Sequence, residues 1–518
     1  MTEPSRRAVV SGLAAGLMGL PALARGQATP FGFETVEGQA KQLAAASFDA
    51  SVPPLPEVLA KLDYDAWRDI RFRPDRAFRV GADGRFRLQL FHLGFLYPRS
   101  VAVSLVKGGM ATPITYDPAL FDLGRTKLDA PLPKDLGYAG IRLHTALNRP
   151  DVIDELIVFV GASYFRFLGQ NQLYGLSARA LAVNTEANGG PEEFPFFRAF
   201  WIEAEGEPGT CTIHALLDGP SQTGAYRFTV RPGAETTVSV TATLFPRRDL
   251  NDAGLAPLTS MYFIGETDRG HSDDYRPELH DSDGLQIAAG SGEWLWRPLD
   301  NPRERRISTL SVKAPKGFGL MQRDRSFADY QDLEAGYERR PGYFVEPEGD
   351  WGEGSVVLVE LPTDNETADN IVAYWQPKAP FPAGQPARLA YRIRAVGGEH
   401  LHPNGQVAHT FLAASAASGA ARKEGDPEGR LARRFLIDFG GGTLDKRPAG
   451  GPPPEVVASA SVGTIVATSI VPNPHVGGFR AALDVRLDAP GTTELRAYLR
   501  DGDGAALTET WTFPWSAA

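Results

Sequence analysis

The segment YRFTVRPGAETTVSVTATL, residues 226–244, decides the fold class. Apolar and polar residues alternate from Tyr226 to Arg231, Pro232-Gly233 interrupts the run, and a β-branched segment continues to Leu244. Alternation with a period of two is typical of a strand with one buried face, and Pro-Gly is a turn signal. The segment therefore predicts two antiparallel strands joined by a short turn.

The same alternation recurs along most of the chain. Helical spacing is clear only within residues 34–72, and strands do not alternate regularly with helices, which argues against a parallel βαβ architecture. The pattern predicts an all-β protein with a large antiparallel sandwich. Further strand-like segments lie at 86–90, 101–105, 307–312, 356–361, 434–439, 456–460, 465–471, 479–487 and 494–499.

A proline-rich segment indicates a domain boundary. Residues 376–386, QPKAPFPAGQP, contain four prolines in eleven positions, and proline cannot donate to a sheet ladder. We expect a large β-sandwich over residues 29–378, a linker over 379–386 and a smaller domain over 387–518. The short strands of the last part have the scale of an immunoglobulin-like sandwich.

The first 28 residues have the pattern of an export signal. Paired Arg6 and Arg7 precede an apolar run to Leu23, and Ala22-Leu23-Ala24 is a small-residue cleavage site. This pattern predicts a twin-arginine signal over residues 1–28 and a periplasmic protein. The apolar run is too short and too rich in glycine for a stable membrane span. We therefore expect no stable membrane insertion.

Charge and cysteine content exclude some classes of ligand and cross-link. The formal net charge is −10, and the sequence has no basic stripe with interleaved aromatic residues, so nucleic acid is not an expected ligand. The single cysteine, Cys211, cannot form an internal disulfide, and its alternating apolar neighbours predict a buried strand position.

Two loops are rich in side chains that could take part in catalysis or binding. The first is HSDDYRPELHDSDGLQIAAGSGEWLWR, residues 271–297, and the second is DNETADN, residues 364–370. Glycosidic bond cleavage needs one carboxyl group to protonate the leaving oxygen and a second group to activate the nucleophile. Glu366 and Asp369, three apart, would share a face on a helical turn. We expect the two loops to meet and to place carboxylates around a sugar.

Other interpretations of the first loop remain open. Asp-Ser-Asp-Gly, residues 281–284, is also an ordinary turn sequence. A metal site would have many candidate ligands, but the sequence has neither a His-x-x-x-His pair nor a calcium-loop register. No Gly-x-Ser-x-Gly supports a serine hydrolase. We predict neither a metal nor another cofactor. The candidate metal ligands are His271, Asp273, Asp274, His280, Asp281 and Asp283.

Several long stretches resemble one protein family, the periplasmic glucan biosynthesis proteins of G and D type, which serve osmoregulated periplasmic glucans. They include GASYFRFLG (161–169), EEFPFFRAFW (192–201), YRPELHDSDGL (275–285), GEWLWRPLDNP (292–302) and NETADNIVAYWQP (365–377). The twin-arginine signal is more similar to the D type. The resemblance implies a large N-terminal galactose-mutarotase-like β-sandwich and a smaller C-terminal immunoglobulin-like domain.

The resemblance also implies an activity on β-1,2-glucan. Family members include anomer-inverting endo-β-1,2-glucanases and transglycosylases that close a ring through an α-1,6 bond. A non-catalytic glucan-binding scaffold for synthesis or export is the alternative. By the family pattern, Asp369 would be the general acid, Asp281 the general base acting through water, and Glu366 a supporting acid. A homodimer is a candidate assembly.

Further positions are expected to contact the glucan. Tyr337 and Arg340, in Gly-Tyr-Glu-Arg-Arg-Pro, match positions that line the glucan site of the family. The remaining expected contacts are Tyr275, Trp294, Trp296, Arg297 and Asn370.

Overall fold

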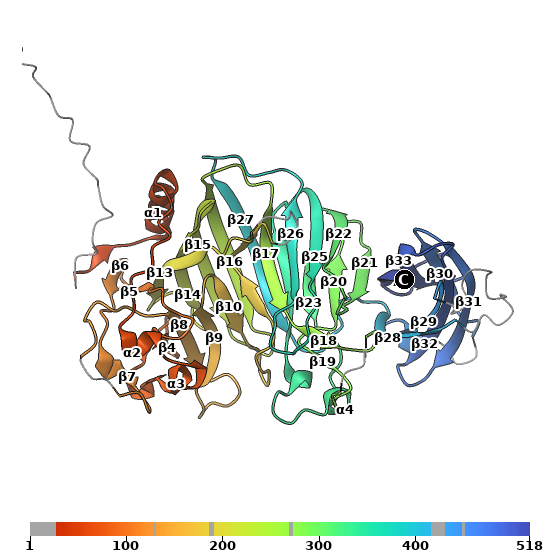
Figure 1. Cartoon of the computed structure of the whole chain (residues 1–518), viewed down its shortest axis with the longest axis horizontal. Helices are drawn as coiled ribbons and strands as arrows, with labels where there is room; N and C mark the ends of the chain where they lie inside the picture. Colours follow the sequence, from red (N-terminus) through yellow and green to blue (C-terminus); the bar gives the residue numbers. More distant parts are fainter. Residues whose placement is uncertain are drawn as a thin grey trace, which may run out of the picture.

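The protein is built mainly from β-strands, as Figure 1 shows. The structure is a computed structural model and describes residues 27–127, 131–185, 191–268, 273–415, 430–447 and 451–517. The predicted predominance of strands is confirmed. Most of the predicted export signal and His271 lie outside the described residues. Within the described part, no helix is long and apolar enough to cross a membrane.

Helices are few, and most are near the N-terminal end of the described chain. The expected helical signal within residues 34–72 is confirmed by three of them. The α-helices are α1 (Phe33–Ala45), α2 (Glu57–Ala60), α3 (Tyr64–Asp69) and α4 (Phe327–Tyr330), and the 3-10 helices are η1 (Pro74–Arg76), η2 (Pro118–Leu120), η3 (Tyr337–Arg339) and η4 (Leu444–Lys446).

The hairpin predicted from residues 226–244 lies in the middle of the largest sheet. β15 and β16 pair antiparallel in continuous register, with Tyr226 opposite Ala242 and Val230 opposite Val238. Tyr226, Phe228 and Val230 are fully buried, so the alternating pattern marks the face that packs against the core. In spatial order the strands of this sheet are β1 (Thr29–Pro30), β6 (Met110–Pro113), β5 (Ala102–Lys107), β13 (Phe196–Glu203), β14 (Cys211–Asp218), β15 (Gln222–Arg231), β16 (Thr237–Pro246), β27 (Ala387–Val396), β24 (Gly342–Glu348), β23 (Gly317–Met321), β20 (Gly284–Ala288), β21 (Trp294–Pro298), β34 (Thr510–Ala517), β33 (Gly491–Arg500) and β30 (Glu455–Ala460).

A second large sheet packs against the first through aromatic rings. Phe159 and Phe165 of the second sheet lie with ring centroids 5.1 and 5.3 Å from Phe228 of the first. Cys211, predicted to be buried in a strand, is buried in β14 of the first sheet. The strands of the second sheet, in order, are β22 (Arg306–Lys313), β25 (Glu353–Glu360), β26 (Ile371–Pro377), β17 (Ala253–Ser260), β11 (Ser177–Arg179), β10 (Tyr164–Phe167), β9 (Asp154–Val160), β8 (Gly140–Thr145), β4 (Phe86–Phe91) and β3 (Phe78–Val80), with β12 (Leu181–Val183) also on β17.

Two pairings in the first sheet run parallel, where an antiparallel sandwich was expected. They are β5 with β13 and β21 with β34. Each joins strands that are far apart in sequence, so no tight hairpin turn forces the antiparallel direction. The pairing of β21 with β34 makes the C-terminal strands a continuation of the large sheet.

The C-terminal strands form a smaller sandwich with its own core. A four-stranded sheet packs against β34, and the ring of Phe435 lies between 5.7 and 5.9 Å from those of Trp511, Phe513 and Trp515. Figure 1 shows this part at one end of the molecule. The four strands are β28 (Gln406–Ala414), β29 (Ala432–Gly440), β32 (Gly478–Arg486) and β31 (Thr464–Asn473), and two small pairs are β18 (Tyr262–Ile264) with β19 (Leu279–His280) and β2 (Arg71–Phe72) with β7 (Phe121–Asp122).

One strand expected in the second domain lies in the first. β27, which follows the proline-rich segment directly, pairs with β16 on one side and β24 on the other. The prolines end β26, and Phe381 between them forms a bridge with Leu250. The segment is therefore a connection between strands of the large sandwich. A proline cannot donate a ladder hydrogen bond, but this does not make it mark the end of a domain.

Candidate active site

Asp281 lies directly after β19 and is largely buried. Its backbone N–H donates to Met261 O at 2.8 Å, and its carboxylate forms an ion pair with the Arg340 guanidinium. Burial raises the pKa of Asp281 above its ordinary value; the charge and hydrogen bond of Arg340 oppose that rise, and the negative charge of Asp369 adds to it. Asp281 is thus a buried acid that the Arg340 guanidinium, with a smaller contribution from Arg166, helps to keep ionised.

Arg340 and Tyr337 connect Asp281 to the second loop. Tyr337 opens η3 and Arg340 follows it, which brings the Arg340 guanidinium 4.0 Å from the centre of the Tyr337 ring. The Tyr337 hydroxyl donates to Glu366 Oε2 at 2.9 Å. A chain of contacts therefore runs from Asp281 to Glu366, and the predicted meeting of the two loops is confirmed.

Glu366 has two partners. Arg276 Nη1 lies 2.9 Å from Glu366 Oε2, the same oxygen that accepts the hydrogen bond from Tyr337. The same guanidinium binds Asp332 at 2.7 Å and Asp274 at 2.8 Å. Because three carboxylates share one arginine, Arg276 is a fixed positive centre of the site.

Asp369 faces a different arginine and remains open to solvent. Arg166 Nη2 lies 3.7 Å from Asp369 Oδ2, and the Asp369 side chain keeps 38% of its exposure. The next residue, Asn370, anchors the loop: its amide binds the backbone N–H and C=O of Tyr262 and the carbonyl of Leu361, each at 2.9 Å. Asn370 is buried, so its side chain positions the loop and does not face a ligand.

Three residues expected beside the glucan make their contacts elsewhere. Trp294 stacks on Phe344 with ring centroids 6.0 Å apart. Trp296 is buried under the Arg323 guanidinium, 3.5 Å from its ring. Trp294, Trp296 and Arg297 were expected beside the glucan. They lie instead where β21 contacts the C-terminal sandwich, because both faces of the strand are covered there.

Arg297 shows the same correction. Its guanidinium binds Glu494 at 2.9 Å and Ser308 Oγ at 2.6 Å, and it is buried. Tyr275, by contrast, is 77% exposed, with the Arg276 guanidinium 6.0 Å from its ring. Of the aromatic residues expected to contact the glucan, Tyr275 is the one whose ring is open beside the acids.

Two further arginines, Arg166 and Arg276, belong to the site. Arg166 belongs to β10, in which Phe165 and Phe167 face the core and Tyr164 and Arg166 face the other side. The alternation of apolar and polar residues in this strand indicates that Arg166 points away from the core. The sequence does not show which carboxylates pair with Arg276, because only the folded chain brings its three partners together.

Among the residues that the structure describes, the metal ligands considered in the first loop do not gather as one group. Asp274 is paired with Arg276, Asp281 with Arg340, and His280 with Glu278 at 2.7 Å. Asp283 ties its turn to the segment after β23, because its Oδ2 accepts the backbone N–H of Arg323 at 2.8 Å. Gly284 is required next to it, since a Cβ there would lie 2.1 Å from the Trp296 ring.

The fold and site define a mainly β protein that gathers acids and arginines from separate loops at a surface open to solvent. The chain belongs to the periplasmic glucan biosynthesis protein family, MdoG, whose family model matches residues 31–515. This membership confirms the resemblance at the family level and implies a periplasmic role in glucan biosynthesis.

Relatives of high similarity are named "Glucans biosynthesis protein G". That of Shewanella baltica (strain OS155) is 44% identical over 489 residues, which cover 94% of this chain and 87% of the relative. That of Ralstonia nicotianae is 44% identical over 499 residues, 96% of this chain and 98% of the relative. That of Vibrio cholerae serotype O1 (strain O395) is 44% identical over 488 residues, 94% and 87%. These relatives carry the G name and not the D name that the export signal led us to expect.

Proposed function

We propose that the protein is an endo-acting, anomer-inverting enzyme of glycoside hydrolase type that acts on β-1,2-glucan. The observation that carries the proposal is the continuous chain of contacts from Asp281 through Arg340 and Tyr337 to Glu366. Acids from loops about 90 residues apart are held around one surface, which is the arrangement that glycoside cleavage with two carboxyl groups requires.

The proposed proton donor is Asp369. Its exposed carboxyl is accessible to a bound polysaccharide, where it would protonate the oxygen of the leaving sugar. Arg166, 3.7 Å away, would balance the carboxylate that this transfer leaves behind. The proton must return to Asp369 from solvent before the next cycle, and the exposure of the side chain permits this.

The proposed base is Asp281, acting through water. Burial separates its carboxylate from direct contact with a large substrate, whereas a water or a short chain of waters can bridge the gap. Arg340 favours the ionised form that a base needs. Glu366 would hold Tyr337 and Arg276 in place, and the open ring of Tyr275 would offer a flat face for a sugar.

Hydrolysis and ring closure are two versions of the same proposal. If water attacks the anomeric carbon, the chain is shortened; if a sugar hydroxyl of the same chain attacks, a cyclic glucan forms through an α-1,6 bond. The acids serve both reactions equally, so the acceptor decides the product.

Mass spectrometry of the products tests the proposal. The purified protein is incubated with linear β-1,2-glucan. Shorter chains that have gained one water indicate hydrolysis, and rings lighter by one water than linear chains of the same length indicate transglycosylation. Unchanged glucan that nevertheless binds the protein would refute catalysis and favour a scaffold for glucan synthesis or export.

We also propose domain types and an export route. The two sandwiches are assigned as galactose-mutarotase-like and immunoglobulin-like, with the division after β27, and comparison of their strand orders with solved representatives tests this. Export is assigned to the twin-arginine route. Replacement of Arg6 and Arg7 by lysine should retain the precursor in the cytoplasm; normal export would exclude that route.

A further inference from the structure

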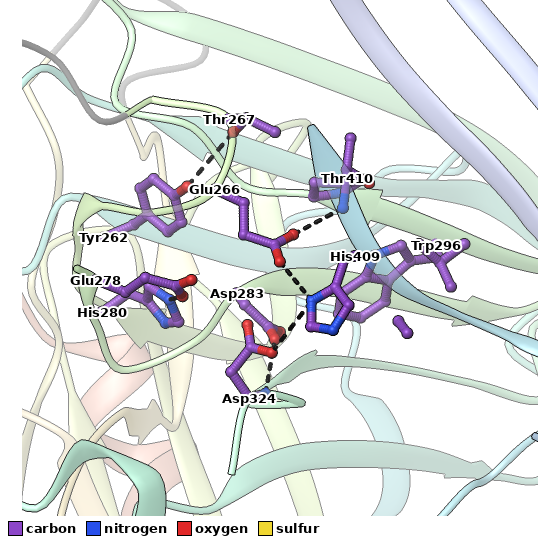
Figure 2. Close-up of a pocket in the computed structure, with 13 residues that line it drawn as sticks. Tyr262, Glu266, Thr267, Glu278, His280, Asp283, Trp296, Asp324, His409 and Thr410 are labelled. Atoms are coloured by element: carbon purple, nitrogen blue, oxygen red, sulfur yellow. Dashed lines mark hydrogen bonds and ion pairs between the residues drawn. The ribbon is translucent and has the colours of Figure 1, made fainter. Parts of the chain in front are cut away.

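A second cluster of ionisable side chains lies behind Asp281. His280 precedes Asp281 at the end of β19 and points into a cavity of about 20 Å³ between the large sandwich and β28. Glu266 reaches the cavity from the loop after β18, Asp324 from the loop after β23, and His409 from β28 (Figure 2). The volume holds about one water-sized sphere.

Glu266, Asp324 and His409 converge on this cavity at distances that suit a metal ion. His409 Nδ1 lies 2.5 Å from Glu266 Oε1 and 3.8 Å from Asp324 Oδ1, and the three donor atoms all lie within 4.8 Å of one another. In a tetrahedral zinc site with bonds of about 2.1 Å, donor atoms are about 3.4 Å apart. Shifts of about 1 Å would therefore bring the three groups into coordination.

An unsatisfied carboxylate points to a ligand independently of this convergence. Asp324 is only 7% exposed, and within the described part of the chain its carboxylate accepts no hydrogen bond; its ion pair is the long contact with His409. Buried polar groups are normally hydrogen-bonded. Asp283 Oδ1, on the same cavity, is also buried and unpartnered.

The charges around Asp324 favour a cation. The carboxylates of Glu266, Asp283 and Asp324 line the same cavity, and the nearby guanidiniums of Arg323 and Arg325 offset part of their negative charge. A divalent ion between the carboxylates would reduce the repulsion among them.

The two histidines of the cluster differ in their availability. Both ring nitrogens of His280 are already engaged, Nδ1 with Gln322 Oε1 at 2.9 Å and Nε2 with Glu278 Oε2 at 2.7 Å. His409 uses only Nδ1, toward Glu266. Glu266 is also oriented by the backbone N–H of Thr410, which donates to its Oε2 at 2.7 Å. His409 is therefore the proposed nitrogen ligand, and the ion would take the place of the proton shared between its Nδ1 and Glu266.

We propose that Glu266, Asp324 and His409 bind one divalent transition-metal ion, of the zinc type, that links β28 to the large sandwich. An imidazole with two carboxylates suits Zn²⁺ or Mn²⁺, whereas Ca²⁺ and Mg²⁺ prefer oxygen ligands alone. Water can complete the coordination from the cavity. The ion would stabilise the contact between β28 and the large sandwich.

Titration of the full chain with zinc tests the site. The protein is stripped of metal with a chelator and titrated with Zn²⁺ by calorimetry, without glucan. We expect one ion per chain and a rise in the thermal midpoint. Asp324→Asn and His409→Gln should each weaken binding at least tenfold. His214→Gln is the matched control, because His214 makes the same kind of pair with Glu203, at 2.7 Å, but belongs to no group of three candidate ligands among the described residues. This variant should bind Zn²⁺ as the wild type does.

Two results would overturn the proposal. One is the absence of saturable binding of both Zn²⁺ and Mn²⁺ to the wild-type chain. The other is wild-type affinity in folded Asp324→Asn. If that variant does not fold, Co²⁺ bound to the wild-type chain provides the second measurement, since a visible spectrum without the bands expected for a nitrogen and oxygen donor set would equally exclude the site. None of these measurements depends on glucan turnover.

Discussion

Replacement of Arg340 by methionine is the sharpest test of the buried base. The side chains of Asp281 and Arg340 are 8% and 17% exposed, so solvent screens their attraction only weakly. Two unit charges about 4 Å apart interact with about 4 kcal/mol at an effective dielectric constant of 20. Since one pKa unit corresponds to about 1.4 kcal/mol, loss of Arg340 can raise the pKa of Asp281 by at most about three units.

The expected shift is smaller than this limit. Arg166 also lowers the pKa of Asp281, and water will enter the space that the guanidinium leaves. We expect a rise of about one to two units. A base must be ionised to act, so the acidic limb of the kcat/KM profile should move to higher pH by the same amount. Stability should fall by about 3 kcal/mol where Asp281 is ionised, and by less at low pH, where its protonation removes the unpaired charge.

The assay is turnover of β-1,2-glucan as a function of pH, with thermal unfolding measured in parallel. Arg340→Lys keeps the charge but loses the flat contact with Tyr337, so its acidic limb should move less. Arg434→Met is the control for lost stability, because Arg434 binds Asp484 through two contacts of 3.0 and 2.6 Å in the C-terminal sandwich. An acidic limb that stays in place in folded Arg340→Met would refute the assignment of Asp281 as base.

Four further substitutions separate catalysis from structure. Asp369→Asn should lower kcat by about 10²–10⁴-fold while calorimetry still detects glucan binding; wild-type turnover would remove Asp369 from the mechanism. Tyr337→Phe, which removes the hydrogen bond to Glu366, should cost about 1 kcal/mol, measured as a roughly fivefold lower kcat/KM, and an unchanged value would make that bond irrelevant to turnover. Trp296→Phe should lower the thermal midpoint but not kcat, and the reverse outcome would return Trp296 to the sugar site. Tyr275→Ala should raise KM with an unchanged thermal midpoint, and an unchanged KM would exclude stacking on this ring.

The sequence predicted strands well but not what each strand face meets. In β15, Tyr226 and Phe228 alternate with polar residues because one face meets the core and the other does not. In β21, Trp296 and Arg297 are both buried, since one face meets the large core and the other the C-terminal sandwich. β34, which pairs with β21, lies more than 200 residues further along the chain. A local sequence pattern cannot reveal such a distant neighbour.

The site was predictable to the extent that it depends on short motifs. The acids of the two loops lie in distinctive stretches, and the structure brings Glu366 into one chain of contacts with Asp281. The arginines depend on the fold: Arg276 meets Asp332 and Glu366 only through tertiary packing. Similarly, the site of Glu266, Asp324 and His409 joins three segments whose spacing resembles no metal motif, so sequence alone did not predict it.

The parallel pairing of β21 with β34 affects the order in which the protein can assemble. The partner of β21 is synthesised about 200 residues later, which takes tens of seconds at about 5–20 residues per second. During this interval β21 is the edge of the large sheet and offers free N–H and C=O groups to any other chain. The nascent protein is therefore most exposed to aggregation just before its final strand arrives, and this is when a chaperone would give it the greatest protection.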